Sequence, residues 1–263
     1  MMPGLVDAVF HGNVPIHDAA AAVQHGVRAV RSDDTSSLKK AVIEWLAEDI
    51  TKSGIPINLT TKLGRGFNHP VTGKLLCPVV LDWSNPDMQL ELKEGCAYIE
   101  DHLINSSDWP AFLYSEYNPQ MPWVGMLRGS LLLKGFKHVF LSPTAANYES
   151  GEGRGTRSGN AALHRMTVVT PASIAYIATH LLFALSSSCV FNKFNVDVDL
   201  VGFYRSIKGF FYDSEWADEA QDLLDWWNRQ IFPALYQAPA TTMKGSHQMA
   251  CMHAAKTAHA IAA

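Results

Sequence analysis

The sequence has few charged residues, and this shortage excludes several classes of protein. Charged residues make up 17% of the 263 residues and hydrophobic residues 48%, a balance that excludes a wholly disordered chain and provides material for a core. The formal net charge of −4 excludes a chain whose overall charge attracts nucleic acid or an anionic membrane. Either kind of binding would need a local basic patch.

Cysteines are also scarce, because the chain has four, far apart and without a CxxC pair. This spacing disfavours a disulfide scaffold and favours free thiols in a reducing compartment. The N-terminus lacks the basic and apolar regions of a secretory signal. We therefore expect an intracellular protein, either cytoplasmic or nuclear.

Long hydrophobic runs are scarce as well. The longest, Ile174–Val190, contains a tyrosine, a histidine and three serines, and it lies at the short end of the roughly 17–25 residues that a membrane helix needs. A buried helix is the better interpretation, so we expect no membrane association. Thr170 and Pro171 are a typical N-cap and first helical residue, and they predict a central helix over Pro171–Ser187.

Other segments have the apolar spacing that is typical of helices packed on a core. The longer ones are Trp123–Phe140, Val198–Tyr212 and Glu215–Phe232, the last with Ser214 as its N-cap. Shorter helices are expected from Ser36 or Ser37 to Gly54, over Pro86–Lys93 and over Cys96–Leu103.

These elements predict an all-α or nearly all-α fold, an irregular helical bundle around the buried central helix. Residues 1–35 are expected to be weakly structured, residues 36–236 to form a single domain, and residues 237–263 to form a flexible tail. Glycines and prolines interrupt the helical pattern over Ile55–Val80. This stretch is expected to be a loop-rich arm across the bundle, with a small hairpin that turns at Val71–Lys74.

A glycine-rich loop precedes the central helix. Backbone NH groups of such a loop can hold a phosphate, and basic side chains on the loop and on the preceding helix would add charge. The candidate anion-binding residues are Arg154, Arg157, Asn160, His164, Arg165, Arg128 and Lys137. The loop matches neither the Walker A motif nor the dinucleotide-binding motif. The alternative is therefore an exposed loop whose arginines keep it in solution.

The C-terminal helices are rich in aromatic residues, and these are candidates for an interaction surface. The residues are Trp216, Trp226, Trp227 and Phe211. Because Trp226 and Trp227 are adjacent, they project about 100° apart on a helix and cannot both be central to one core face. The alternative is an ordinary aromatic core where helices cross.

No motif identifies a reaction, a metal site or a cofactor. The serines lack the GxSxG elbow of hydrolases, and the histidines and the cysteine near the C-terminus have no known zinc spacing. We therefore predict no metal and no cofactor. His138 and His164 are the candidates for a general base, and a hydrogen-bonded structural histidine is the alternative for His138 and for His180.

Four blocks carry a family resemblance, namely PWVGMLRGSLLLKGFKHVFLSP, TRSGNAALHRMTVVTPASIAYIATHLLFALSSS, FYRSIKGFFYD and LLDWWNRQIFP. They resemble an expanded family of uncharacterised proteins in mushroom-forming (basidiomycete) fungi, over about Leu76–Pro233. The resemblance implies a fungal, intracellular origin, and it implies no activity and no catalytic residue. Many copies per genome are also similar to what mobile elements leave behind.

Three functions follow as hypotheses. The first is a non-catalytic domain that binds a protein partner or a second copy of itself. The second is a protein that binds nucleic acid or phosphate, for example as part of a mobile element. The third is an enzyme that uses His138 or His164 in a reaction that the sequence does not identify.

Overall fold

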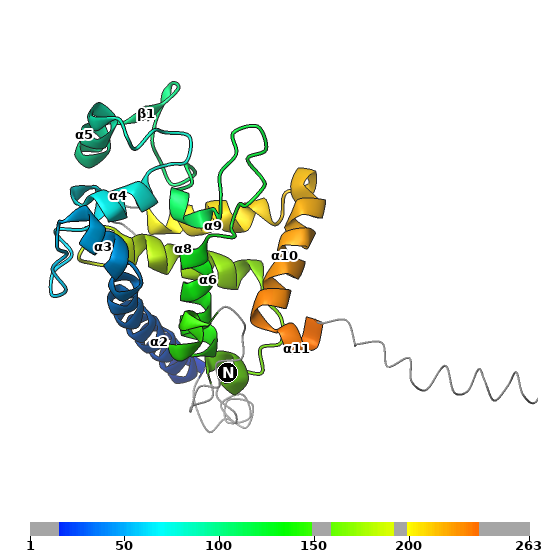
Figure 1. The fold of residues 1–263 in the computed structure, drawn as a ribbon. Helices are drawn as coiled ribbons and strands as arrows, with labels where there is room; N and C mark the ends of the chain where they lie inside the picture. The colour runs from blue at the N-terminus through cyan, green and yellow to red at the C-terminus, as the bar shows by residue number, and fades with distance from the viewer. Residues whose placement is uncertain (1–15, 149–158, 192–198, 237–263) are drawn as a thin grey trace, which may run out of the picture.

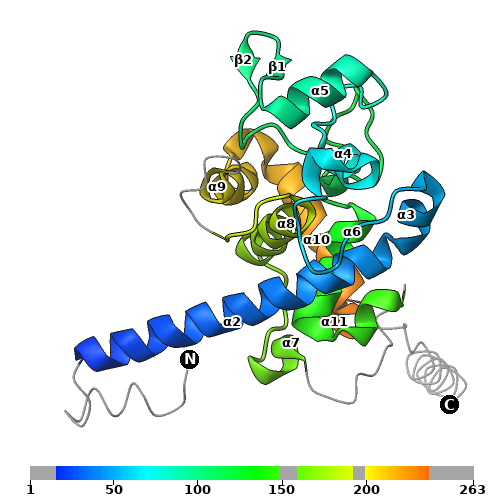
Figure 2. The ribbon, with the colours of Figure 1, turned by 90° about the vertical axis from the view of Figure 1, so that its left-hand side faces the viewer.

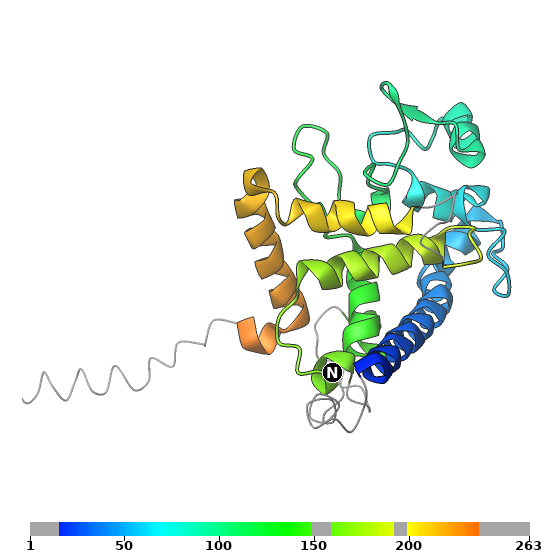
Figure 3. The ribbon, with the colours of Figure 1, turned by 180° about the vertical axis from the view of Figure 1, so that it is seen from behind.

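The computed structural model describes residues 16–148, 159–191 and 199–236. The fold is mostly α-helical, as predicted, and its helices pack around α8 (Pro171–Leu185) (Figure 1). α2 (Ile16–Trp45), α6 (Ser130–Phe136) and α9 (Leu200–Phe210) contact α8 directly. α2 and α10 (Ala217–Ile231) lie on opposite sides of α8 and α6 (Figures 1 and 3).

The central helix begins where the sequence predicts. The Thr170 hydroxyl accepts a hydrogen bond from the Ser173 NH, and the Ser173 hydroxyl accepts one from the Thr170 NH, so the two side chains form a capping box. Apolar residues occupy nearly every face of α8, and all the residues from Ile174 to Leu185 except Tyr176 and Leu182 are buried. A helix that is apolar all round is stable only at the centre of a core.

The first helix is longer than predicted. α2 runs without a break from Ile16 to Trp45, so the predicted start at Ser36 or Ser37 is wrong, and so is the weak structure expected over residues 16–35. Residues 34–37 are polar because they contact side chains of other elements across the bundle, and they do not form a linker. The N-terminal half of α2 extends away from the other helices (Figure 2).

The arm after α2 is partly helical. It contains α3 (Ala47–Ser53), a 3₁₀ turn η1 (Gly66–Asn68) and α4 (Pro70–Leu76). The predicted turn at Val71–Lys74 is wrong, because these residues lie inside α4. The His69 ring accepts a hydrogen bond from the Val71 NH, and Pro70 fits the first turn, so the segment has a helix start that Gly73 obscures in the sequence.

The next segment contains the predicted helix α5 (Pro86–Glu94) and a hairpin in place of the second helix expected over Cys96–Leu103. Strand β1 (Tyr98–Ile99) pairs antiparallel with β2 (His102–Leu103). Glu100 has a φ of 53°, which ends any helix there and forms the turn between the strands.

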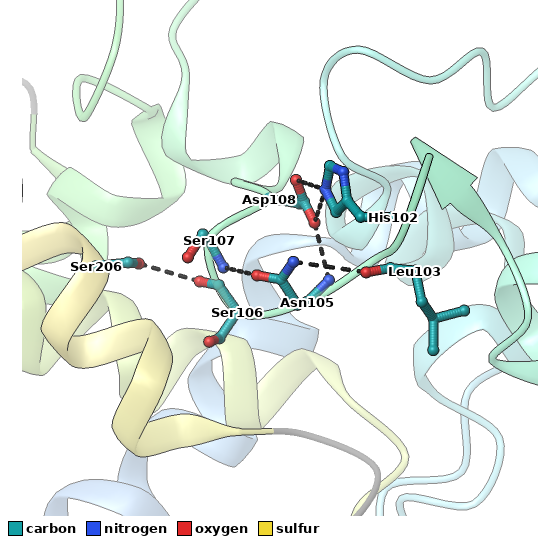
Figure 4. Close-up of polar contacts among 7 residues, drawn as sticks. All are labelled: His102, Leu103, Asn105, Ser106, Ser107, Asp108 and Ser206. Carbon is teal, nitrogen blue, oxygen red and sulfur yellow. Dashed lines mark hydrogen bonds and ion pairs between the residues drawn. The ribbon is translucent and has the colours of Figure 1, made fainter. Parts of the chain in front are cut away.

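The hairpin is attached to α9 through residues 105–109 (Figure 4). The Ser206 hydroxyl donates to the Ser106 carbonyl at 3.0 Å and accepts from the Trp109 indole at 3.1 Å. On the outer side, His102 Nε2 lies 3.2 Å from both carboxylate oxygens of Asp108 (Figure 4). This segment therefore positions the hairpin on the bundle.

The helix predicted over Trp123–Phe140 is much shorter. Residues 115–129 form an irregular loop, and only then do α6 and a π-helical turn η3 (Lys137–Leu141) follow. Gly125 and Leu127 have φ values of 79° and 53°, which interrupt a right-handed helix. Other backbone approaches Gly125 and Gly129 closely, and it belongs to residues 115–116 of the same loop and to a 3₁₀ turn, η2 (Ala111–Leu113).

The C-terminal helices agree with prediction except at their ends. α9 and α10 correspond to the helices expected over Val198–Tyr212 and Glu215–Phe232, with a 3₁₀ turn η5 (Ser214–Trp216) before α10. The predicted cap at Ser214 is wrong, because the Asp213 carboxylate accepts from the Glu215 NH. The remaining elements are η4 (Thr144–Asn147), α7 (Asn160–Leu163) and α11 (Pro233–Tyr236).

The predictions for residues 1–15 and for the 237–263 tail lie outside the described residues. Among the helices that the structure describes, none is both long and apolar enough to cross a bilayer.

Gly129 provides a test of this fold. A Cβ at Gly129 would lie 2.0 Å from the Phe112 carbonyl oxygen, and backbone cannot move aside as a flexible side chain can. Gly129→Ala is therefore expected to lower the free energy of unfolding by about 3 kcal/mol in urea denaturation. The matched control is Gly209→Ala in α9, where a Cβ meets nothing within 4 Å. It should raise that free energy by up to about 1 kcal/mol, and equal effects of the two substitutions would contradict the described loop.

Candidate functional site

The predicted anion-binding residues do not converge in the described part of the chain. Arg154 and Arg157 lie outside the described residues. The Arg128 guanidinium stacks 5.4 Å from the Trp226 ring on α10. His164 and Arg165 are exposed just after α7.

The other two members of that set have structural partners at the π-helical turn. Lys137 is buried, and its ammonium donates to the Tyr148 carbonyl at 2.9 Å, so this predicted anion-binding residue has a structural partner. The Asn160 amide donates to the Val139 carbonyl at 2.9 Å. A π-turn leaves carbonyls without regular helical partners. Asn160 thus joins α7 to η3, and Lys137 joins η3 to the residue that follows η4.

Two of the buried histidines, His138 and His180, contact polar residues of α2. His138 Nε2 lies 2.6 Å from the Ser37 hydroxyl, and His180 Nδ1 lies 3.0 Å from the Thr35 hydroxyl. The Tyr176 hydroxyl donates to Asp34 at 2.7 Å beside them. Burial lowers the pKa of His138, and burial together with Arg31 lowers the pKa of His180 to about 4. Both rings are therefore neutral hydrogen-bonding groups between helices.

Ser37 and His138 are a serine and a histidine in contact, as a serine nucleophile and its base would be. The backbone around Ser37, however, does not suit a nucleophile. Ser37 lies in the middle of α2, where backbone NH groups are already bonded within the helix. These NH groups cannot form an oxyanion hole. The geometry therefore favours the structural interpretation of His138 over the catalytic one.

An open hollow of about 400 Å³ lies between α4 and the 115–129 loop. Cys77, Trp83 and Tyr117 are among the residues that line it. Burial and the nearby Asp82 raise the pKa of the Cys77 thiol to about 11, so this thiol is protonated and a weak nucleophile at neutral pH. The hollow therefore has a mainly apolar lining, and its cysteine is not an activated nucleophile.

Two buried cations that sequence reasoning missed lie at the C-terminal end of α8. The Lys62 ammonium donates to the carbonyls of Phe183 and Ser188, the second at 2.6 Å, and lies 3.4 Å from the centre of the Phe183 ring. Arg65 donates to the Ala184 carbonyl at 2.9 Å and to the Lys39 carbonyl at 3.0 Å. These cations satisfy carbonyls that the end of a helix leaves without partners.

Lys62 and Arg65 together cap the C-terminal end of α8, and their surroundings shift the pKa values of both side chains. Burial, followed by the charges of Arg65 and Lys39, lowers the pKa of Lys62 to about 7, and Cys189 opposes this shift. Burial also lowers the pKa of Arg65. The signal in the sequence was a lysine and an arginine three residues apart within a glycine-containing loop, a pattern that occurs on many surfaces.

Lys62 tests the importance of this cap. Lys62→Met keeps an apolar stem of similar length but removes the amine, so the carbonyls of Phe183 in α8 and of Ser188 just after it lose this donor. The expected loss in unfolding free energy is about 2 kcal/mol in urea denaturation. Lys52→Met is the matched control, because the exposed Lys52 forms only a surface ion pair with Glu48 and should change stability by less than about 0.5 kcal/mol. Equal losses for both variants would contradict the cap.

The predicted aromatic residues divide between core and surface. Trp227 is fully buried, and its indole NH donates to the Leu127 carbonyl at 3.1 Å, so its prediction as an interaction residue is wrong. Its neighbour Trp226 is half-buried, in agreement with the 100° between adjacent positions. Phe211 packs against the core. Trp216 is half-buried, and its ring faces the 115–129 loop.

Trp216 and that loop form an exposed apolar surface, which we call the tryptophan patch and define as Met121, Trp123, Val124 and Trp216. The rings of Trp123 and Trp216 lie 6.1 Å apart. Met121, Trp123 and Val124 are 42–48% exposed although they are apolar. Sequence reasoning missed these three residues because it placed Trp123 and Val124 in a helix and Met121 just before it.

The loop holds the patch in a fixed geometry. The Ser115 NH donates to the Gly125 carbonyl at 2.9 Å, which closes the loop at its base. Gly125 has a φ of 79°, and a Cβ there would lie 2.4 Å from the Glu116 carbonyl oxygen, so only glycine fits. The Val124 NH donates to the Met121 carbonyl at 3.0 Å within the loop. A closed loop of this kind is a common position for binding residues.

Three acidic side chains lie within six residues of Trp216 in the chain. We call Glu215, Asp218 and Asp222, all exposed on η5 and α10, the acidic flank. Asp218 and Asp222 lie one turn apart on the same face of α10, and Glu215 and Asp218 are close neighbours of Trp216 in the chain. The patch and its flank together offer an apolar surface with negative charge along one side.

Comparison with known proteins identifies the family of this chain. A family model described as a family of unknown function, DUF6698, matches residues 25–232. This range includes the first three blocks described above and all but the last residue of the fourth, and it extends into α2. No curated protein and no solved structure matches the chain.

Proposed function

We propose, from the premise that this chain belongs to the DUF6698 family of unknown function, that it is a non-catalytic protein-interaction domain. The tryptophan patch is its binding surface. The observation that supports this proposal is the exposure of three apolar side chains, 42–48% each, on a hydrogen-bonded loop beside Trp216. Tryptophans on a rigid support are the residue type most enriched where partners bind.

The chemistry of the surface selects the partner. An apolar patch beside Glu215, Asp218 and Asp222 fits a segment that carries apolar residues on one face and basic residues next to them. An amphipathic helix provides this arrangement with anchors at i, i+4 and i+7. A nucleic acid is disfavoured at this surface because its phosphates would face the acidic flank.

The same reasoning ranks the other hypotheses lower. Phosphate binding has less support because Lys137 is buried and Arg128 stacks on Trp226. Catalysis has less support because His138 connects two helices. We also propose a cytoplasmic or nuclear location, supported by the free thiols of Cys77, Cys96 and Cys189, and a fungal origin, supported by the sequence blocks alone.

The test uses two synthetic helical peptides of equal length with leucines at i, i+4 and i+7, one flanked by arginines and the other by glutamates. We expect the basic peptide to quench tryptophan fluorescence saturably, and the acidic peptide not to bind. In the Trp123→Ala/Trp216→Ala variant, the affinity for the basic peptide should fall at least tenfold. Isothermal titration calorimetry measures this affinity.

Trp83→Ala is the control, because Trp83 lines the separate hollow near Cys77 and its removal should leave peptide affinity unchanged. Circular dichroism confirms that each variant is folded. Equal binding of both peptides, or unchanged affinity in the Trp123/Trp216 variant, would refute the proposed surface.

A further inference from the structure

The N-terminal half of α2 has an apolar face without a partner in the described chain. Val23, Val27 and Val30 follow one another at i, i+4 and i+7 and are 46–54% exposed. This half of the helix extends beyond the bundle (Figure 2). Gly26 and the three β-branched valines lower the helix propensity of a segment that is otherwise rich in alanine, and a partner that covers the valines would stabilise it.

The charges beside this face complement the acidic flank. Arg28 and Arg31 are exposed, one turn apart, on one side of the valines, while Asp18 and Asp33 project from the other side of α2. The tryptophan patch has its acids on one side as well, on η5 and α10. The two surfaces therefore match in both respects, apolar against apolar and basic against acidic.

The two surfaces cannot meet within one chain. α2 and α10 lie on opposite sides of α8 and α6 (Figures 1 and 3), and the exposed half of α2 points away from the bundle (Figure 2). A contact between them would therefore join two molecules.

We infer that the occupant of the tryptophan patch is the N-terminal half of α2, about Asp18–Arg31, from a second copy of this chain. This inference rests on the proposed function and names the partner. Val23, Val27 and Val30 cover Met121, Trp123 and Trp216, and Arg28 and Arg31 face Asp218 and Asp222. The contact is heterologous, because each copy offers one surface and uses the other, so it closes into a ring or extends as a chain.

The experiment exchanges the charges in the full chain. Variant R28E/R31E makes α2 acidic, and variant D218K/D222K makes the flank basic. Each variant alone should stay monomeric in sedimentation velocity at concentrations where the unchanged chain associates, from about 10 to about 500 µM for an interface of one helix face. An equimolar mixture should associate again, because each α2 then meets a flank of opposite charge.

The matched control is K40E/K52E, which makes the same change of charge at exposed positions on the C-terminal half of α2 and on α3. It should associate like the unchanged chain, with a dissociation constant within about threefold. Trp123→Ala/Trp216→Ala should weaken association at least tenfold.

Three results would overturn the inference. They are a monomeric unchanged chain over the whole concentration range, association that D218K/D222K leaves intact, and a mixture that stays monomeric. The second result would indicate pairing of α2 with α2. If the basic peptide binds the patch while any of these occurs, the proposed function stands and only the identity of the partner is wrong. If the peptide fails as well, both are wrong.

Discussion

The burial of α8 is the constraint on which the rest of the fold depends. This helix is apolar on nearly every face and needs neighbours all round. Its C-terminal carbonyls would be costly to bury without donors, at about 1–3 kcal/mol for each unpaired group. Lys62 and Arg65 provide donors from the arm, which explains why a loop-rich segment packs against the helix end.

The same constraint accounts for the polar residues of α2. A helix beside α8 must pair the polar groups that α8 presents, which are Tyr176 and His180, and Asp34 and Thr35 do so. The C-terminal half of α2 is thereby fixed to the bundle. Among the described residues, its N-terminal half makes no such contact and carries the exposed valines. One helix therefore has both a structural part and a part available to a partner.

The sequence predicted the parts of the fold whose signals are local. α8 has an N-cap, a proline and continuous apolar residues, and α5 has an asparagine cap followed by proline, so both were predicted nearly to their ends. The helix predicted at α2 was too short because residues 31–37 have the composition of a linker. The partners of Thr35 and Ser37 lie more than 100 residues away in the chain. Such long-range pairing leaves no trace in local composition.

The candidate site was harder to predict for the same reason. Trp216 was identified by its aromatic neighbours, but Trp123 was assigned to a helix because the apolar spacing continues through Gly125. The positive φ of Gly125 and Leu127 follows from the closure of the loop on Ser115 and Glu116, which is a tertiary effect. The cap formed by Lys62 and Arg65 depends equally on which helix end the arm reaches.

Native-state hydrogen exchange of α8 tests the central claim most directly. Helix ends normally fray, and their amides exchange faster than those of the helix middle. If Lys62 and Arg65 cap a fully buried helix, the amides of Ala184, Leu185 and Ser186 should exchange as slowly as those near Ala178, and far more slowly than the last amides of the more exposed α5. Rapid exchange at Ala184–Ser186, similar to that at the end of α5, would contradict the account.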